Sequence, residues 1–419
     1  MTILIRQAQI VDPTSPHHQS RQDVFIENGI IREMGSCNRQ ADQVIERPNL
    51  HLSPGWMDVF AHFCDPGLEQ KETIETGIRA AAAGGFTDVL VLPNTQPTIS
   101  GKTQVEYVLH KAAGAPVRVH PMGAISKNIE GKDLAEMYDM HQAGAVAFTD
   151  GLKPVQSAGL LLKALQYTKA MQAVVVQLPD DTSIARHGLM NEGIISTRLG
   201  LPGKPALAEE IMVQRDLQLL AYTESKLHLT GITTAAGLQQ VAAAKAAGLQ
   251  VSASVTPAHL YFSDADLQHY DTNLKLYPPL RTEADRDALR HAVVSGTIDC
   301  IASHHMPHEY DSKTCEFEFA QPGMLALETA YGVTGAALQG ALTPERWVQL
   351  VAINPRTIFG LAVPSITAGN PAVVTLFDPS ATYTFTREMI RSRSANTPFV
   401  GKTLTGKVYG IINQQHILI

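Results

Sequence analysis

The chain has 419 residues, a formal net charge of -7, and 44% hydrophobic and 17% charged residues. This length suits a barrel of about 250 residues or more with an attached module. No Lys/Arg cluster and no apolar run near the ~20 residues that span a bilayer is present, which argues against a nucleic-acid or membrane partner. The four cysteines (Cys37, Cys64, Cys300 and Cys315) lack metal-binding spacing, and the N-terminus lacks a signal-peptide pattern. We therefore expect a cytoplasmic protein.

Residues 1–52 contain short alternating segments, such as "ILIRQAQIVDP" and "QDVFIENGIIREMG", with turn residues between them. This pattern is typical of β-strands. We assign residues 1–52 as the N-terminal part of a small β-sandwich, which the C-terminal segment described below completes.

Residues 53–365 alternate short β-branched runs with helical patterns, many of which end in Gly, a common residue at a helix C-terminus. Eight strands are predicted: Trp56–His62, Phe86–Leu92, Val117–Ala124, Ala145–Asp150, Ala173–Leu178, Lys226–Ile232, Val251–Thr256 and Asp299–His304. Eight strand–helix units indicate an α/β fold, a (β/α)8 TIM-type barrel whose chemistry lies at the C-terminal ends of the strands. His62, Asp150 and His304 would then share one rim.

Residues 366–419 return to alternating patterns, including "PAVVTLFDPSATYTF" and "GKTLTGKVYGIINQQHILI". Because chain ends of a domain often lie close together, we expect this segment to complete the β-sandwich begun by residues 1–52. The barrel is therefore bracketed by an all-β module.

Several stretches carry a family resemblance: "SPGWMDVFAHFCDPGLEQKETIETGIRAAAAGGFTDVLVLPNTQP", "GAVAFTDG", "GLPGKPALAEEIMVQRDL", "YPPLRTEADRDAL", "IDCIASHHMPH", "FAQPGMLALETA", "INPRTIFGL" and "SANTPFVGKTLTGKV". Over nearly its whole length the chain resembles the dihydroorotases of the amidohydrolase superfamily, of the multifunctional-complex type. The resemblance implies hydrolysis and condensation of the cyclic amide dihydroorotate in pyrimidine synthesis. It also implies zinc held by side chains at the strand ends.

The zinc-binding positions of the family are mostly lost. On the first strand the family has HxH followed by an arginine that grips the substrate carboxylate, and these positions hold Phe60, His62 and Cys64. The histidines expected on strands 5 and 6 align with Gln177 and Gly231. One ligand of the first strand, the substrate clamp and both later histidines are therefore absent.

The catalytic and substrate positions are changed as well. His304 stands at the position of the catalytic aspartate, and Tyr277 replaces the asparagine expected before "PPLR". Asp150 matches a metal-binding aspartate, although the "FTDG" motif is one acidic residue short and leaves its register open. The resemblance implies that three pocket features survive: Asn94, His308 and Gly323.

The sequence favours a pseudoenzyme, a dihydroorotase-like barrel without a metal that supports pyrimidine synthesis as a structural partner of aspartate carbamoyltransferase. Some relatives with such losses act in this way, and homodimerisation is also expected from the family. A catalytic zinc site needs three or more protein ligands to lower the pKa of its bound water from ~15.7 to ~7.

Two alternatives stay open. One is an active cyclic-amide hydrolase with a reduced mononuclear zinc site at His62, Asp150 and His304. The other is metabolite binding through Asn94 and His308 without turnover. We favour a hydrogen-bonded residue of the barrel mouth over a metal ligand for His62, whereas Asp150 fits a turn residue as well as a metal ligand.

Overall fold

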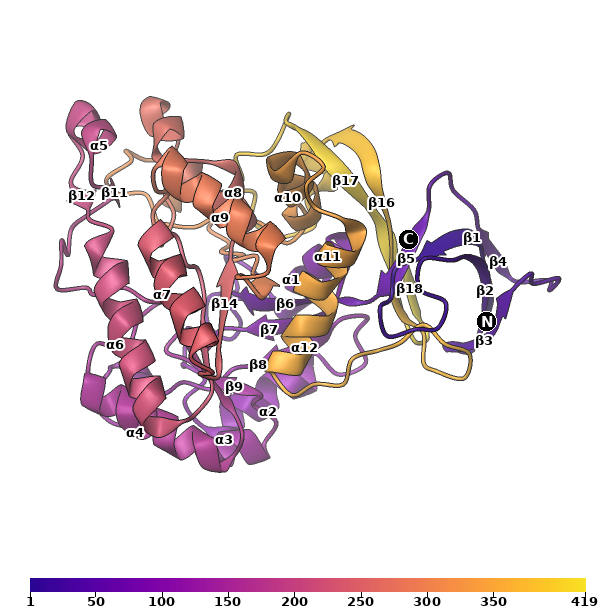
Figure 1. Ribbon diagram of the computed structural model, residues 1–419, viewed down its shortest axis with the longest axis horizontal. Helices are drawn as coiled ribbons and strands as arrows, with labels where there is room; N and C mark the ends of the chain where they lie inside the picture. The colour runs from indigo at the N-terminus through magenta and orange to yellow at the C-terminus, as the bar shows by residue number, and fades with distance from the viewer.

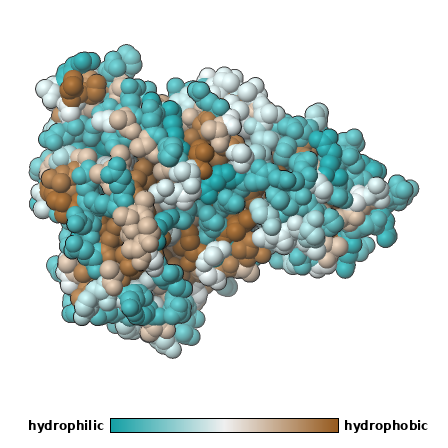
Figure 2. Space-filling model, viewed as in Figure 1, coloured by the Kyte–Doolittle hydropathy of each residue, from teal (hydrophilic) through white to brown (hydrophobic).

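The computed structural model describes all 419 residues and has two parts, a barrel of strands and helices and a smaller β-sheet module (Figure 1). Both chain ends lie in the β-sheet module, and the barrel occupies the middle of the chain. The surface in Figure 2 is mainly hydrophilic over the β-sheet module and carries scattered apolar patches over the barrel helices. No helix has the length and apolar character needed to cross a bilayer.

The barrel has eight parallel strands: β6 (Trp56–Ala61), β7 (Phe86–Val91), β8 (Arg118–Pro121), β9 (Ala147–Phe148), β10 (Val174–Gln177), β13 (Leu227–Leu229), β14 (Val251–Val255) and β15 (Cys300–Ile301). They form one group in the order β6-β7-β8 and another in the order β9-β10-β13-β14-β15. Single parallel bridges join the groups, between Gly123 and Phe148 and between Ala61 and His305. The ring is thereby closed, and the predicted (β/α)8 barrel is confirmed.

Several strands are shorter than predicted because their last residues leave the ladder before the rim. Asp150 and His304, which the sequence places at strand ends, lie in the loops that follow β9 and β15. These residues still face the C-terminal rim, since each follows its strand directly.

The barrel helices are α1 (Ile74–Ala83), α2 (Lys102–Lys111), α3 (Met137–Gln142), α4 (Ala158–Ala170), α6 (Leu207–Thr223), α7 (Ala235–Ala246) and α9 (Glu283–Ser295), followed by α11 (Pro344–Val348), a π-helical turn (Gln349–Ile353) and α12 (Asn354–Ile358). Thr73, Ser157, Thr234 and Thr282 each accept a backbone N–H at a helix N-terminus, as N-cap residues do. The pattern "KDLAEMYDMHQAG" of residues 132–144 predicts a helix along its whole length, but α3 begins only at Met137. Leu134, before the helix, instead forms an antiparallel bridge with Ser126 in the preceding loop.

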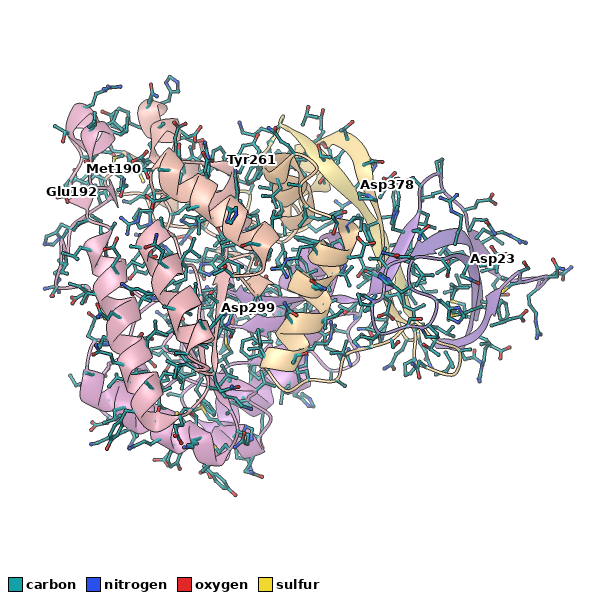
Figure 3. The ribbon with its side chains drawn as sticks, in the orientation of Figure 1. Asp23, Met190, Glu192, Tyr261, Asp299 and Asp378 are labelled. Carbon is teal, nitrogen blue, oxygen red and sulfur yellow. The ribbon has the colours of Figure 1, made fainter.

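The remaining short elements are β11 (Met190–Asn191), α5 (Ile194–Leu199), β12 (Gly203–Lys204), α8 (Pro257–Tyr261), α10 (Ala330–Leu338) and the 3-10 turns η1 (Lys127–Ile129), η2 (Asp264–His269), η3 (Thr272–Leu274), η4 (Tyr310–Ser312) and η6 (Arg387–Met389). Of these, α8, η3, η4 and η6 contribute residues to the pockets described below. Figure 3 shows Met190 and Glu192 on the projecting α5 excursion.

The β-sheet module is built from both ends of the chain. Its strands are β1 (Thr2–Ile10), β2 (Arg21–Glu27), β3 (Ile30–Gly35), β4 (Gln43–Ile45), β5 (His51–Pro54), β16 (Val373–Thr384), β17 (Thr403–Asn413) and β18 (His416–Leu418). They follow the order β18-β17-β16-β5-β1-β2-β3, with β4 also paired to β1. Because β5 pairs with both β1 and β16, the expected module forms one hydrogen-bonded path rather than two separate sheets.

The barrel interior is packed with side chains. Thirteen buried residues form this inner cluster, among them Met57, Phe60, Leu90, Val176 and Ala302. A second cluster of 61 residues fills the layer between strands and helices, and a third of 15 residues fills the β-sheet module. Phe60 therefore belongs to the packed interior beneath the rim.

Candidate functional site

The side chains of Phe60 and His304 meet the backbone of Gly231 at the centre of the barrel mouth. The Phe60 ring is fully buried and stacks on the His304 ring with 4.3 Å between centroids and 29° between planes. Gly231 has φ +66°, and a Cβ there would lie 2.8 Å from His304 Cε1. Phe60 and Gly231 thus accommodate the His304 imidazole at the barrel mouth.

His304 is held as a neutral side chain. Its Nε2 lies 2.8 Å from Thr230 Oγ1, and burial lowers its pKa to about 3, with His259 and His228 adding to the effect. An imidazole with so low a pKa is a weak proton acceptor at neutral pH. The His304 side chain is therefore engaged in packing and in one hydrogen bond.

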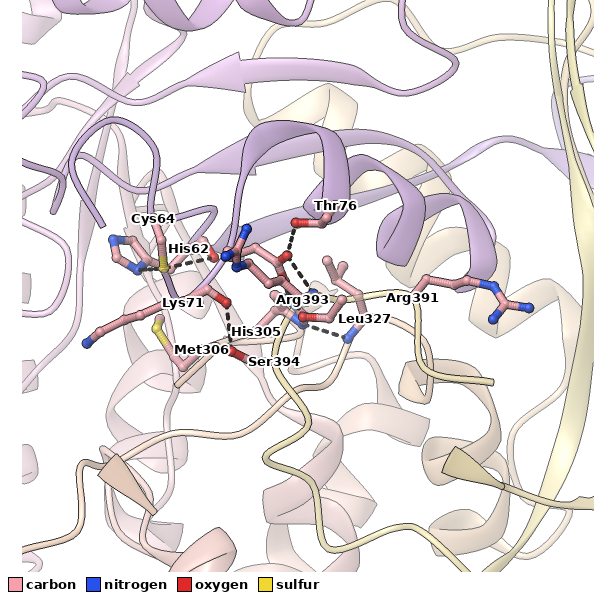
Figure 4. A network of polar contacts seen from close by, with 12 residues as sticks. His62, Cys64, Lys71, Thr76, His305, Met306, Leu327, Arg391, Arg393 and Ser394 are labelled. Atoms are coloured by element: carbon pink, nitrogen blue, oxygen red, sulfur yellow. Dashed lines mark hydrogen bonds and ion pairs between the residues drawn. The ribbon is translucent and has the colours of Figure 1, made fainter. Parts of the chain in front are cut away.

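His62 and Cys64 bind each other and the next loop. Cys64 Sγ lies 3.0 Å from His62 Nδ1 (Figure 4). His62 Nε2 donates to the carbonyl oxygen of Asn94 over 3.1 Å. Burial lowers the pKa of His62 to about 4 and raises the pKa of the Cys64 thiol. The pair consists of a neutral imidazole and a protonated thiol, so neither His62 nor Cys64 carries a positive charge.

Asp150 serves as a local cap. Its carboxylate accepts the backbone N–H groups of Ile125 and Ser126, each over 2.9 Å, and the Ser126 hydroxyl over 2.5 Å. Burial raises its pKa despite these hydrogen bonds. The carboxylate is thus directed to the loop after β8, as the turn interpretation of Asp150 expects.

Gln177 and the neighbouring His228 are satisfied in the same way. Gln177 exchanges two side-chain hydrogen bonds with the backbone of Val155, at 3.3 and 3.4 Å. His228 lies between Ser252 Oγ at 2.8 Å and Ser254 Oγ at 3.0 Å, and burial lowers its pKa to about 3. Both nitrogens of this imidazole are already engaged.

The residues present do not fit a metal. No group of three or more His, Cys, Asp or Glu side chains is arranged to hold an ion. The reduced site suggested by the sequence, at His62, Asp150 and His304, is not brought together. His62 instead contacts Cys64 and Asn94. Asp150 contacts Ser126, and His304 contacts Thr230.

A pocket of about 140 Å³ remains beside His304; its lining residues are Leu152, Thr256, Ala258, His259, Leu276, Tyr277, Ser303, His304, Met306, Pro322, Gly323 and Met324. Tyr277 donates to Asp180 over 2.6 Å, and Lys204 donates to the same carboxylate oxygen over 2.5 Å. Burial, together with Asp180, raises the pKa of the Tyr277 hydroxyl. The pocket is therefore lined by neutral groups.

Only one of the three expected pocket remnants lines this space. Gly323 lines the pocket and has φ +133°. A Cβ at this position would lie only 2.4 Å from Met306 Cβ, so the site has no space for a side chain. Asn94 binds the loop after β9, donating to Asp150 O and accepting from Leu152 N. His308 lies outside this pocket and donates through Nε2 to Pro322 O over 3.0 Å.

Two buried carboxylates of the rim were not found from the sequence. Asp58 on β6 accepts the backbone N–H and the hydroxyl of Ser303, at 2.6 and 2.9 Å. Glu72 lies 3.4 Å from His305 Nε2 and accepts from Thr76 and Ser392 (Figure 4). Partners more than 200 positions apart leave no local spacing signal, so only the fold could reveal them.

Comparison with known proteins agrees with this architecture. Residues 50–236 match the family model described as dihydro-orotase-like. A protein named dihydroorotase from Desulfotalea psychrophila is 39% identical over 407 residues, covering 97% of this chain and 96% of the relative. A dihydroorotase from Carboxydothermus hydrogenoformans is 40% identical and covers 95% of each chain. The chain belongs to the dihydroorotase family.

Solved structures show the same fold at lower identity. L-hydantoinase (dihydropyrimidinase) from Arthrobacter aurescens superposes with a TM-score of 0.85 at 20% identity, covering 99% of this chain and 95% of that one. Dihydropyrimidinase from Brevibacillus agri gives a TM-score of 0.83 at 20% identity, with coverage of 100% and 95%. This member of the dihydroorotase family thus shares the barrel fold of these two enzymes.

Proposed function

We propose that this chain is a non-catalytic member of the dihydroorotase family that acts in pyrimidine synthesis as a structural subunit. The observation that carries the proposal is the stack of Phe60 on His304, with the His304 ring against Gly231. Packed side chains occupy the space at these positions. A centre that activates water would need open coordination there.

The chemistry of the remaining groups supports the same conclusion. Dihydroorotate hydrolysis needs an activated water, a base that carries a proton, and a positive group for the substrate carboxylate. His304, whose pKa is about 3, would be a poor base, and the neutral Cys64 thiol would be a poor partner for a carboxylate. His62 has both ring nitrogens engaged.

The test is turnover and metal content of the pure, full-length protein. Dihydroorotate hydrolysis and carbamoyl aspartate condensation are followed with and without added zinc, with the Desulfotalea psychrophila relative as a matched control. The expected result is no turnover above the uncatalysed rate and far less than one zinc per chain. Stoichiometric zinc with turnover near that of the control would refute the proposal.

We further propose aspartate carbamoyltransferase as the partner and a homodimer as the form of the isolated chain. The support is the family resemblance, together with a barrel that is complete in all eight strands. Light scattering after size exclusion, on the chain alone and co-expressed with the transferase of its own organism, tests both points. Separate elution of the two proteins would refute the proposed partnership, and a monomeric mass for the chain alone would refute the proposed homodimer.

A further inference from the structure

A second, larger pocket of about 450 Å³ lies between three segments on the rim side. One is the loop after β15 that contains η4, another is η3, and the third is the segment from η6 towards β17. The lining residues are Gln70, Thr272, Asn273, His308, Glu309, Tyr310, Lys313, Thr314, Arg387, Arg393, Ser394, Ala395 and Asn396. Unlike the pocket at His304, it is lined mainly by polar and charged side chains.

Positive charge dominates this pocket. Arg387 and Arg393 are exposed, and neither guanidinium lies within ion-pair distance of a carboxylate. Lys313 is buried, and its Nζ donates only to the carbonyl oxygens of Gln321 and Gly323, at 2.7 and 3.0 Å. Three cations in one pocket of a chain with net charge -7 form a local positive site.

The negative and neutral groups do not balance these cations. Glu309 is the one acidic residue of the lining, and it lies 4.0 Å from Lys71. Asp271, next to η3, accepts the backbone and side-chain N–H groups of Asn273. His308 adds no charge at neutral pH, because burial lowers its pKa to about 4.

This pocket is separate from the one at His304, and the two share no lining residue. The wall between them is the segment of Pro322 and Gly323, which lines the smaller pocket. His308 and Lys313, on the side of the larger pocket, donate to the carbonyl oxygens of these two residues. The larger pocket therefore has a built wall of its own.

We propose that this pocket binds a small multivalent oxyanion, a phosphate-bearing molecule or a dicarboxylate, between Arg387, Arg393 and Lys313. Planar guanidinium groups donate paired hydrogen bonds to phosphate and carboxylate oxygens. An anion at this place would also supply the negative partner that buried Lys313 lacks. The site does not depend on whether the barrel mouth is catalytic, so its test is independent of the function proposed above.

The experiment is calorimetric titration of the full-length protein with inorganic phosphate, glycerol 3-phosphate and succinate, against chloride at equal ionic strength. The test variant is the double substitution Arg387→Gln with Arg393→Gln. The control is Arg391→Gln, which removes a neighbouring exposed arginine that donates to Glu388 O. Its side chain points away from Arg393 and Ser394 (Figure 4).

We expect saturable binding of at least one of the three anions, weakened about tenfold or more in the double variant and unchanged in Arg391→Gln. Binding of both phosphates without succinate would identify phosphate as the recognised group, and succinate alone would identify a dicarboxylate. No binding beyond chloride, or equal losses in the double variant and in Arg391→Gln, would overturn the proposal.

Discussion

Replacing Gly231 by alanine tests whether the His304 ring occupies the space at the mouth of the barrel. The new Cβ would lie 2.8 Å from His304 Cε1 and 3.1 Å from Leu178 Cδ1. The backbone at Gly231 has φ +66°, a conformation that residues with a Cβ adopt at a cost. The substitution therefore introduces two separable penalties, backbone strain and a clash with the imidazole.

The two penalties have different sizes and different dependence on His304. Left-handed backbone costs roughly 1–2 kcal/mol for a residue with a Cβ. Overpacking a tight contact adds about 1–3 kcal/mol. Gly231→Ala should thus lower the free energy of unfolding by about 2–5 kcal/mol, and by only about 1–2 kcal/mol in a His304→Ala background, where the clash with the ring is gone.

The measurement is urea unfolding of the parent, both single variants and the double variant, monitored by circular dichroism. A coupling energy of about 1–3 kcal/mol between the two positions is the expected result, because residues in contact are not additive. A matched control is Gly248→Ala, where φ is +81° but no atom lies within 4 Å of the new Cβ. Additive effects at Gly231 and His304 would refute the packed-mouth interpretation.

Three further predictions concern buried groups. Unfolded His304 takes up a proton below pH ~6.5 while the folded side chain, with a pKa of about 3, stays neutral, so stability falls as pH drops. Between pH 7 and pH 5.5 the free energy of unfolding should therefore fall by about 1.3 kcal/mol less in His304→Gln than in the parent, as measured by urea unfolding. Phe60→Ala should cost about 3–5 kcal/mol in the same assay and leave zinc content unchanged. Glu72→Gln should cost about 3–5 kcal/mol and speed limited proteolysis near Ser392, whose hydroxyl and following N–H bind Glu72.

Much of the barrel could be predicted because its signals are local. A cap residue, an apolar face and a terminal glycine define helices such as α1 and α9, and β-branched runs define the strands between them. The start of α3 is later than the helical pattern of residues 132–144 predicts. Leu134 forms a bridge with Ser126, and helix periodicity carries no signal for a contact with a residue outside the helix.

The changed site was only partly predictable. The family resemblance singled out Phe60 and Gly231 as changed positions, but the sequence could not show that both pack against His304. The sequence also offered no sign that Asn94 would bind the Asp150 loop instead of lining the pocket. Such contacts join residues dozens to hundreds of positions apart, so they exist only once the barrel has closed.

Hydrogen bonds at the barrel mouth connect the ends of several strands. A metal bound by several strands cross-links their ends, and its binding energy contributes to folding. In this chain other bonds make comparable cross-links: His62 reaches the loop after β7, Asp150 reaches the loop after β8, and Thr230 joins β13 to His304 after β15. The side chains of His62, Asp150 and His304 each have a hydrogen-bond partner inside the protein, which avoids the cost of burying them unpaired. The hydrogen bonds of the rim therefore stabilise the barrel, and the non-catalytic function proposed above needs no metal to hold the strand ends together.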